Sequence, residues 1–125
     1  MQNDTVGYGP VMSVPVAVDQ LPAALEEFGT VAYLLSAGAD GRPRCVSVSL
    51  HWAQDRLVAK VGKRTGSNVT AQPLMSLLWP PVEPGGFSLI VDGTATVSDT
   101  ASEDGDGGAT LAITPTSGVR HRNAT

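Results

Sequence analysis

The chain of 125 residues contains a single cysteine, Cys45, so no disulfide can form within it. It also has only 8 lysines and arginines against 12 acidic residues, which gives a formal net charge of −4. Non-specific nucleic-acid binding requires basic side chains that neutralise phosphates, so this balance disfavours a nucleic-acid partner. A chain without disulfides fits a reducing compartment, and no signal-peptide pattern opens the sequence. We therefore expect a cytoplasmic protein.

Several motifs that carry chemistry are also missing. No apolar run approaches the roughly 20 residues that span a bilayer, so we expect no membrane partner. The sequence lacks a P-loop, a G-x-S-x-G elbow and a G-x-G-x-x-G fingerprint. One cysteine and two distant histidines leave no zinc-type site, and Asp104 and Asp106 lack the spacing of a calcium loop. His51 has no identifiable acidic partner, so we expect neither a metal site nor a catalytic acid–base pair.

The glycine and proline content is high, at 14 and 9 residues, which indicates short elements joined by turns. With 42% hydrophobic residues, the chain can build a core, and its length fits a single domain over residues 1–125. We expect an extended arm at 1–13 and a flexible acidic loop at 99–108. One helix is predicted over 21–28, with Asp19 as its N-terminal cap and Gly29 at its end. Its apolar stripe consists of Leu21, Leu25 and Phe28.

Six segments have strand character: 31–37, 44–52, 56–61, 74–79, 87–97 and 109–120. Segment 44–52 alternates most clearly, with apolar residues on one face and small or polar residues on the other. Asp92 and Gly93 predict a bulge in the fifth segment. A short helix, capped by Thr65 or Ser67, is expected before Pro73. The pattern predicts an all-β domain whose antiparallel strands form a closed or nearly closed barrel.

A basic cluster follows the third strand, where Lys60, Lys63 and Arg64 fall within five residues. These cations, with nearby hydroxyls and a helix N-terminus, suit a phosphate group. Arg64 is the stronger candidate, because an arginine can bind phosphate through two parallel hydrogen bonds. The alternative is an ordinary solvated turn.

The polar face of the second strand presents Ser47, Ser49 and His51. Small hydroxyl side chains leave room for a flat ligand and can hydrogen-bond its edge. Plain solvent exposure or a dimer interface explains the same pattern. Trp52, Trp79 and Tyr33 could stack on an aromatic ligand, although in a small barrel such residues more often belong to a core or an interface.

The order of the elements resembles the pyridoxamine 5'-phosphate oxidase-like family of FMN-binding split β-barrels. Strand V-A-Y-L-L-S-A is followed by turn A-D-G-R-P-R and strands C-V-S-V-S-L-H-W and R-L-V-A-K-V. Then come a basic turn with a short helix ending at Q-P, strand L-M-S-L-L-W-P-P, long strand F-S-L-I-V-D-G-T-A-T-V and strand L-A-I-T-P-T. The likeness covers about Leu21 to Val119.

The resemblance implies a six-stranded antiparallel split barrel of Greek-key type, which forms a homodimer with FMN at the subunit interface. It assigns the FMN phosphate to Arg64 and Thr65, with Lys60 or Lys63 nearby. Many members have a second basic residue where this sequence has Thr65. The isoalloxazine contacts fall on Val46, Ser47, Val48 and Ser49, and Ser88 matches a position that some members direct at the flavin from the partner chain.

The resemblance also implies a small FMN-dependent oxidoreductase with a small-molecule substrate. The C-terminal residues that grip pyridoxal phosphate in true oxidases are not evident, so vitamin-B6 oxidation is not expected. A deazaflavin cofactor is a close variant. The alternative is a non-catalytic split-barrel module that binds no flavin, or binds a deazaflavin or haem without turnover.

Overall fold

The computed structural model describes residues 12–99 and 108–123, so the predictions for residues 1–11 and 100–107 lie outside it. Among these residues, no helix combines the length and apolar character needed to cross a membrane. The elements in chain order are β1 (Ser13–Val16), η1 (Val18–Gln20), α1 (Leu21–Phe28), β2 (Val31–Ala37), β3 (Pro43–Ala53), β4 (Arg56–Val61), α2 (Lys63–Ala71), β5 (Leu74–Trp79), β6 (Ser88–Asp99) and β7 (Ala109–His121).

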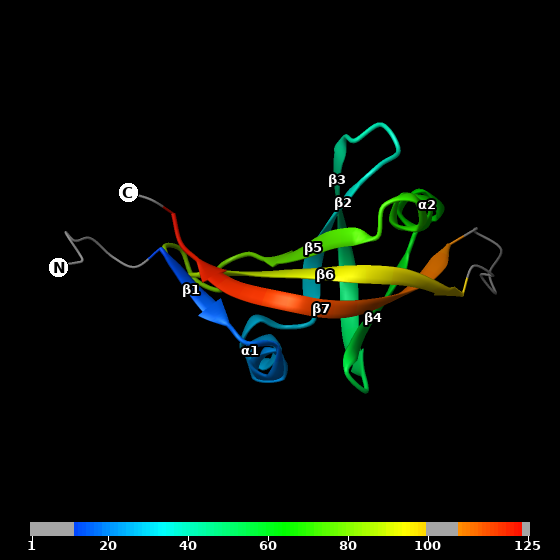
Figure 1. Ribbon diagram of the computed structural model, residues 1–125. Coiled ribbons are helices and arrows are strands. Elements are labelled where there is room, and N and C mark those ends of the chain that lie inside the picture. The colour runs from blue at the N-terminus through cyan, green and yellow to red at the C-terminus, as the bar shows by residue number, and fades with distance from the viewer. Residues whose placement is uncertain (1–11, 100–107, 124–125) are drawn as a thin grey trace.

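The strands form one antiparallel sheet in the order β1-β7-β4-β3-β2-β5-β6, and β6 also pairs with β7. This last pairing closes six strands into a barrel, which confirms the predicted all-β split-barrel fold. In Figure 1, the long β6 and β7 run side by side, while the β2–β3 hairpin projects away from them. β1 lies beside the end of β7, outside the closed ring.

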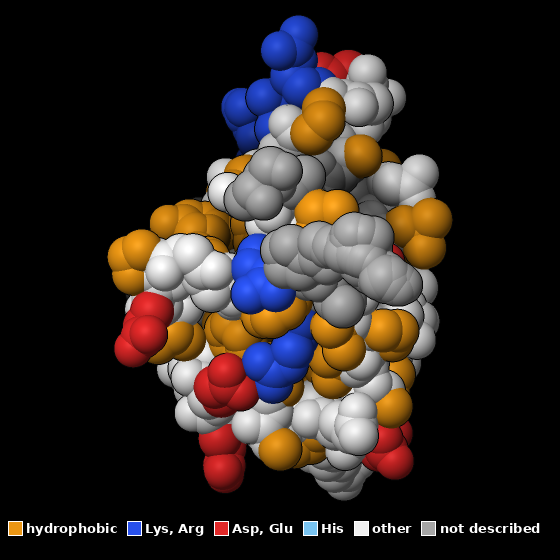
Figure 2. All heavy atoms as spheres, turned by 90° about the vertical axis from the view of Figure 1, so that its left-hand side faces the viewer, with side chains coloured by type: hydrophobic (Ala, Val, Ile, Leu, Met, Phe, Trp, Pro, Cys, Tyr) orange, Lys and Arg blue, Asp and Glu red, His pale blue; other side chains and the backbone are white. Residues whose placement is uncertain are grey.

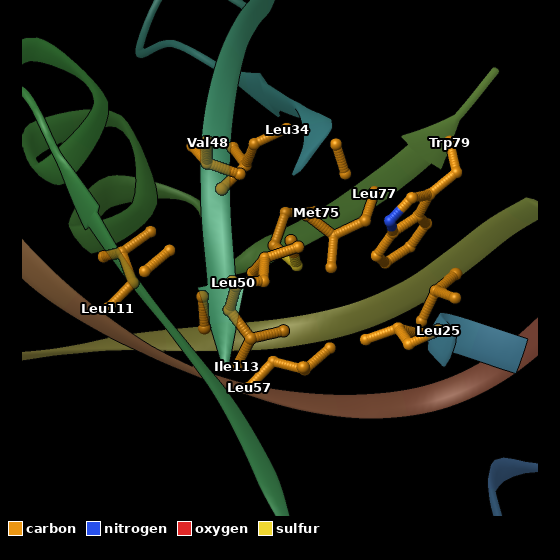
Figure 3. Packing of buried hydrophobic residues seen from close by; sticks show 14 of the residues in the cluster. Leu25, Leu34, Val48, Leu50, Leu57, Met75, Leu77, Trp79, Leu111 and Ile113 are labelled. Carbon is orange, nitrogen blue, oxygen red and sulfur yellow. The ribbon is translucent and has the colours of Figure 1, made fainter. Parts of the chain in front are cut away.

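The barrel interior contains the inward row of each strand, as alternation requires. Leu34, Leu57, Leu77, Leu111 and Ile113, from strands β2, β4, β5 and β7, are completely buried, and Figure 3 shows these side chains converging. Trp79 belongs to this core and donates its indole N–H to the carbonyl oxygen of Gly29 at 2.9 Å. Trp79, one of the three aromatic residues considered for stacking on a ligand, is therefore a core residue.

Helix α1 has the predicted bounds, Leu21–Phe28, and buries Leu21 and Leu25 against the barrel. Gly29 ends it with a positive φ of 93°, as expected for a C-terminal stop. The predicted cap Asp19 is wrong, because the preceding residues form the 3-10 turn η1 and Gln20 directly precedes the helix. The Gln20 side chain instead accepts a hydrogen bond from the backbone N–H of Ala17 at 3.2 Å.

Strand β1 was not predicted, because four residues that include a proline give too short a pattern. It pairs with the last residues of β7, from Ser13 opposite His121 to Val16 opposite Gly118. Gly118 permits this approach, since an added Cβ would lie 3.1 Å from the Val16 carbonyl oxygen. The pairing extends β7 beyond the ring, so the expected arm at 1–13 has strand structure at its last residue.

A register shift between β6 and β7 lies at Asp92–Gly93, the predicted position, but the bulged strand is β7 rather than β6. Asp92 pairs with Ser117 and Gly93 pairs with Pro115, so Thr116 is the extra residue. The two strands approach closely there, and a Cβ on Gly93 would lie 2.7 Å from the Thr114 carbonyl oxygen. A glycine is therefore required at this position.

We predict that Gly93→Ala lowers the free energy of unfolding by about 1–3 kcal/mol, because the backbone must shift to admit the methyl group. Urea unfolding of the two proteins measures this loss. Gly62→Ala is the matched control, since an added Cβ there meets nothing within 4 Å. A loss no larger than that of the control would contradict the account of the bulge.

One ion pair connects α1 to the end of β7. The Arg120 guanidinium donates two hydrogen bonds to the Glu27 carboxylate, at 2.9 and 3.1 Å, and also lies over the Phe28 ring. Figure 2 looks onto this end of the molecule and shows basic side chains among hydrophobic ones. These hydrogen bonds lower the pKa of Glu27, although partial desolvation opposes the effect.

Because its pKa is lower in the folded protein, Glu27 stabilises the fold above its ordinary pKa, and this contribution is lost as the pH falls through the lowered value. We predict that Glu27→Gln costs at most about 1 kcal/mol near neutral pH, since the pair is partly exposed. Below about pH 4 the difference in the free energy of unfolding between the native protein and Glu27→Gln should become smaller. Urea unfolding of both proteins across this range tests it, and a constant difference would contradict the assignment.

Candidate functional site

The barrel is split between β3 and β4. β4 pairs with β3 only from Leu50 to Ala53, whereas β3 pairs with β2 from Pro43 to Ser49. The first half of β3 therefore has β2 on one side and no ladder with β4 on the other. This separation leaves that edge of β3 without a paired strand among the described residues.

Ser47 and Ser49 lie exposed on the outer face of β3, as the alternation of this strand predicts. Their partners on β2 are Tyr33 and Val31, which are 42% and 57% exposed. The two hydroxyls thus lie beside an uncovered apolar strip. Sequence reasoning considered Tyr33 only as a stacking candidate and did not single out Val31, because an exposed valine has no signal of its own.

The two valines assigned to ring contacts differ in position. Val48 is only 5% exposed and belongs to the core, so a ligand on the outer face could reach only its backbone. Val46 is on the same face as Val48 but lies farther along the hairpin, where 37% of it is exposed. It is therefore open to contact beyond the core.

Lys60 lies exposed on β4, on the outward row that also contains Val58, and Val58 pairs with His51. β4 then leads directly into α2, whose first two residues are Lys63 and Arg64, both exposed. The structure thus brings the predicted basic cluster to one end of the split. Neither Lys63 nor Arg64 forms an ion pair with any residue that the structure describes.

The cap predicted for this helix is wrong, because Gly62 is the N-cap of α2. Thr65 therefore lies inside the first turn, 7% exposed against the barrel, and Ser67 lies in the second turn. No described side chain caps the N-terminus of α2, so its first N–H groups point away without a side-chain acceptor. The end of α2 before Pro73 is as predicted.

A cleft of about 510 Å³ lies beside α2, where the helix meets β6 and β7. Lys63, Ser67 and Thr70 line it on the helix side, and Val97 and Ala109 line it on the barrel side. Gly66 allows the helix to lie this close, since an added Cβ would be 3.0 Å from the Ala109 Cβ. The residues Ser47–Ser49 do not line this cleft.

Ser88 lies far from the basic cluster within one chain. It pairs with His121 at one end of β7, whereas Lys60 pairs with Thr110 near the other end. Eleven residues of strand separate these positions, which corresponds to roughly 35 Å along β7. The Ser88 hydroxyl donates to the His121 carbonyl oxygen at 3.0 Å, so it has a structural partner in its own chain.

Sequence comparison adds two relatives. The chain is 37% identical over 90 residues to uncharacterized proteins of Mycobacterium bovis and Mycobacterium tuberculosis, which covers 72% of this chain. The chain matches only 55% of the length of each relative. No family model matches the sequence.

Structure comparison gives a broader set. A pyridoxamine 5'-phosphate oxidase-like protein of Listeria innocua superposes with a TM-score of 0.65 at 21% identity, over 86% of this chain and 98% of that one. The haem storage protein HutZ of Vibrio cholerae has a TM-score of 0.64 at 16% identity, over 82% and 94% of the two chains. An FAD-binding protein of Mesorhizobium loti has a TM-score of 0.64 at 15% identity, over 90% and 98%.

These solved structures share the closed six-stranded ring with this chain, while what they bind differs from one to the next. The common element is the barrel itself. This chain therefore has the split β-barrel fold of the pyridoxamine 5'-phosphate oxidase-like proteins.

Proposed function

We propose that this protein is a small FMN-dependent oxidoreductase that binds its flavin at the split between β3 and β4. The observation that carries the proposal is the N-terminus of α2. Its N–H groups have no side-chain cap among the described residues, and Lys63 and Arg64 lie exposed on its first turn. Backbone donors at a helix N-terminus, together with two cations, fit the dianionic phosphate of FMN.

The remainder of the flavin would extend from this phosphate along the outer face of β3. Lys60 lies exposed near the end of β4, shortly before α2, and Ser47 and Ser49 would offer hydroxyl groups to the polar edge of the ring. Val46 points to the opposite face of β3 from these serines, so it would meet a flavin on the outer face only through its backbone. Thr65 and Val48 are buried, so they would support the site through the backbone.

We further propose that a second copy of the chain covers this face. Val31 and Tyr33 are large exposed hydrophobic residues directly beside Ser49 and Ser47, and such a strip is typical of an interface. A homodimer would enclose the flavin from both sides. It would also explain how Ser88, distant within one chain, could reach the cofactor of the partner.

Bound FMN would supply the electron or hydride transfer, and the protein would supply placement and charge. The side chains near the split are hydroxyls and cations rather than an acid–base pair, which suits that division. The substrate of the enzyme would be a small molecule. The single, exposed Cys45 is compatible with a protein that functions in the reducing cytoplasm.

A non-catalytic binding module is the second candidate. It is favoured by the fact that Ser47–Ser49 do not line the cleft beside Lys63, so one chain does not enclose a ligand there. The solved structures that resemble this chain include an F420 reductase and a haem-binding protein of Mycobacterium smegmatis. Parallel titrations with FMN, F420 and haem separate these candidates. Preference for FMN, followed by reduction and reoxidation of the bound flavin, supports the oxidoreductase.

We predict that Arg64→Ala weakens FMN binding at least tenfold, about 1.4 kcal/mol, because it removes a phosphate ligand. Quenching of flavin fluorescence during titration measures the dissociation constant. Arg56→Ala is the matched control, since Arg56 is exposed at the other end of β4. An unchanged constant in Arg64→Ala would remove this residue from the site.

We predict that Tyr33→Asp converts the dimer to a monomer at micromolar concentration, because it places a charge in the proposed apolar interface. Size-exclusion chromatography with light scattering measures the molar mass. Val82→Asp is the control, since Val82 is 65% exposed in the β5–β6 connection. A monomeric native protein, or a dimer that survives Tyr33→Asp, would contradict the proposed interface.

A further inference from the structure

A second cleft, of about 400 Å³, lies on the other side of the β2–β3 hairpin and shares no lining residue with the cleft beside α2. Its apolar walls include Leu35, Pro43 and Leu74, and Leu74 is 64% exposed. Its polar end consists of Ser76 and Asp92 on neighbouring strands, with Thr116 from β7.

The bulge between β6 and β7 builds this polar end. Asp92 is the residue just before the register shift, and Thr116 is the extra residue that the bulge inserts. Bulges redirect side chains and are frequent beside binding sites. Here the bulge brings the Asp92 carboxylate and the Thr116 hydroxyl to one cleft.

The hydrogen bonds at this end use the available hydroxyl protons. Ser76 Oγ donates to Asp92 Oδ1 at 2.6 Å, and Thr116 Oγ1 donates to the Asp92 carbonyl oxygen at 3.1 Å. Both hydroxyls therefore have only lone pairs left to offer to a ligand. The second carboxylate oxygen of Asp92 offers lone pairs as well. The polar end therefore presents acceptors and negative charge.

Nothing among the described residues compensates this charge. No lysine or arginine lines the cleft, and no ion pair joins Asp92 to another described residue. Arg44, next to Pro43 in the chain, instead lies 3.8 Å from Asp40 at the tip of the hairpin. Basic side chains are visible at that tip in Figure 2, at the top of the molecule.

We propose that this cleft is a binding site for an organic ammonium ion, with the ammonium group on Asp92 and Ser76 and an apolar body against Leu35 and Leu74. A primary ammonium has three donors and one positive charge, which complements an end made of acceptors and one carboxylate. The apolar walls select a hydrocarbon substituent over a bare inorganic cation. The residues of this site are separate from those assigned to the flavin, and the cleft borders the proposed dimer face, because Leu35 lies on the same outward row of β2 as Tyr33.

The probe is n-hexylammonium, compared with 1-hexanol, which has the same chain length and no charge. Amide chemical shifts of the native full-length protein report binding. We predict shifts at Leu35, Ser76 and Thr116, and at least tenfold tighter binding of the ammonium. Asp92→Asn, which keeps an acceptor for Ser76, should reduce its affinity to that of the alcohol. Asp55→Asn is the matched control, because Asp55 is exposed in the β3–β4 turn.

Leu74→Ala tests the apolar wall without disturbing the core, and it should weaken n-hexylammonium while leaving methylammonium unchanged. Equal affinity for the ammonium and the alcohol would overturn the proposal, as would an equal effect of Asp55→Asn. The proposal would also be overturned if tens of millimolar n-hexylammonium caused no amide shifts in the cleft. That result is expected if a second copy of the chain covers the cleft. FMN affinity measured in the same Asp92→Asn sample should be unchanged, so failure here is separate from failure of the flavin proposal.

Discussion

The pairing of β7 with β6 is the constraint on which the rest of the structure depends. β7 is 13 residues long, and one of its edges follows β6 through almost its whole length. The other edge is shared by β4 at the start and β1 at the end. A single strand therefore closes the ring, seats the N-terminal strand and holds α1 through the Arg120–Glu27 pair.

This closure also explains why the barrel is split. β4 pairs with β7 from Leu57 to Val61 and with β3 only from Leu50 to Ala53, so the first half of β3 extends with β2 as a projecting hairpin. The outward face of the hairpin contains Ser47 and Ser49 beside Val31 and Tyr33, and the same outward row of β2 continues with Leu35 into the cleft at the bulge. The same topology thus leaves one face of the hairpin and the cleft that borders it open to a ligand.

The sequence predicts elements better than it predicts contacts. Alternation locates β3, the turn signals locate α1, and Asp92-Gly93 locates the bulge, because each depends on neighbouring residues. The cap of α2 and the burial of Thr65 depend on where β4 releases the chain against β7, so local propensity misplaces both. β1 and the bulge cleft bring together residues about 100 and 80 positions apart, and no pattern within a single segment predicts such contacts.

The central claim is that a flavin binds at the split and that two chains enclose it. Sedimentation velocity of the protein mixed with FMN, detected at a wavelength where only flavin absorbs, tests both parts at once. We predict that flavin absorbance sediments with a species of twice the chain mass. Flavin that remains unsedimented, or that moves with a species of one chain mass, would contradict the account.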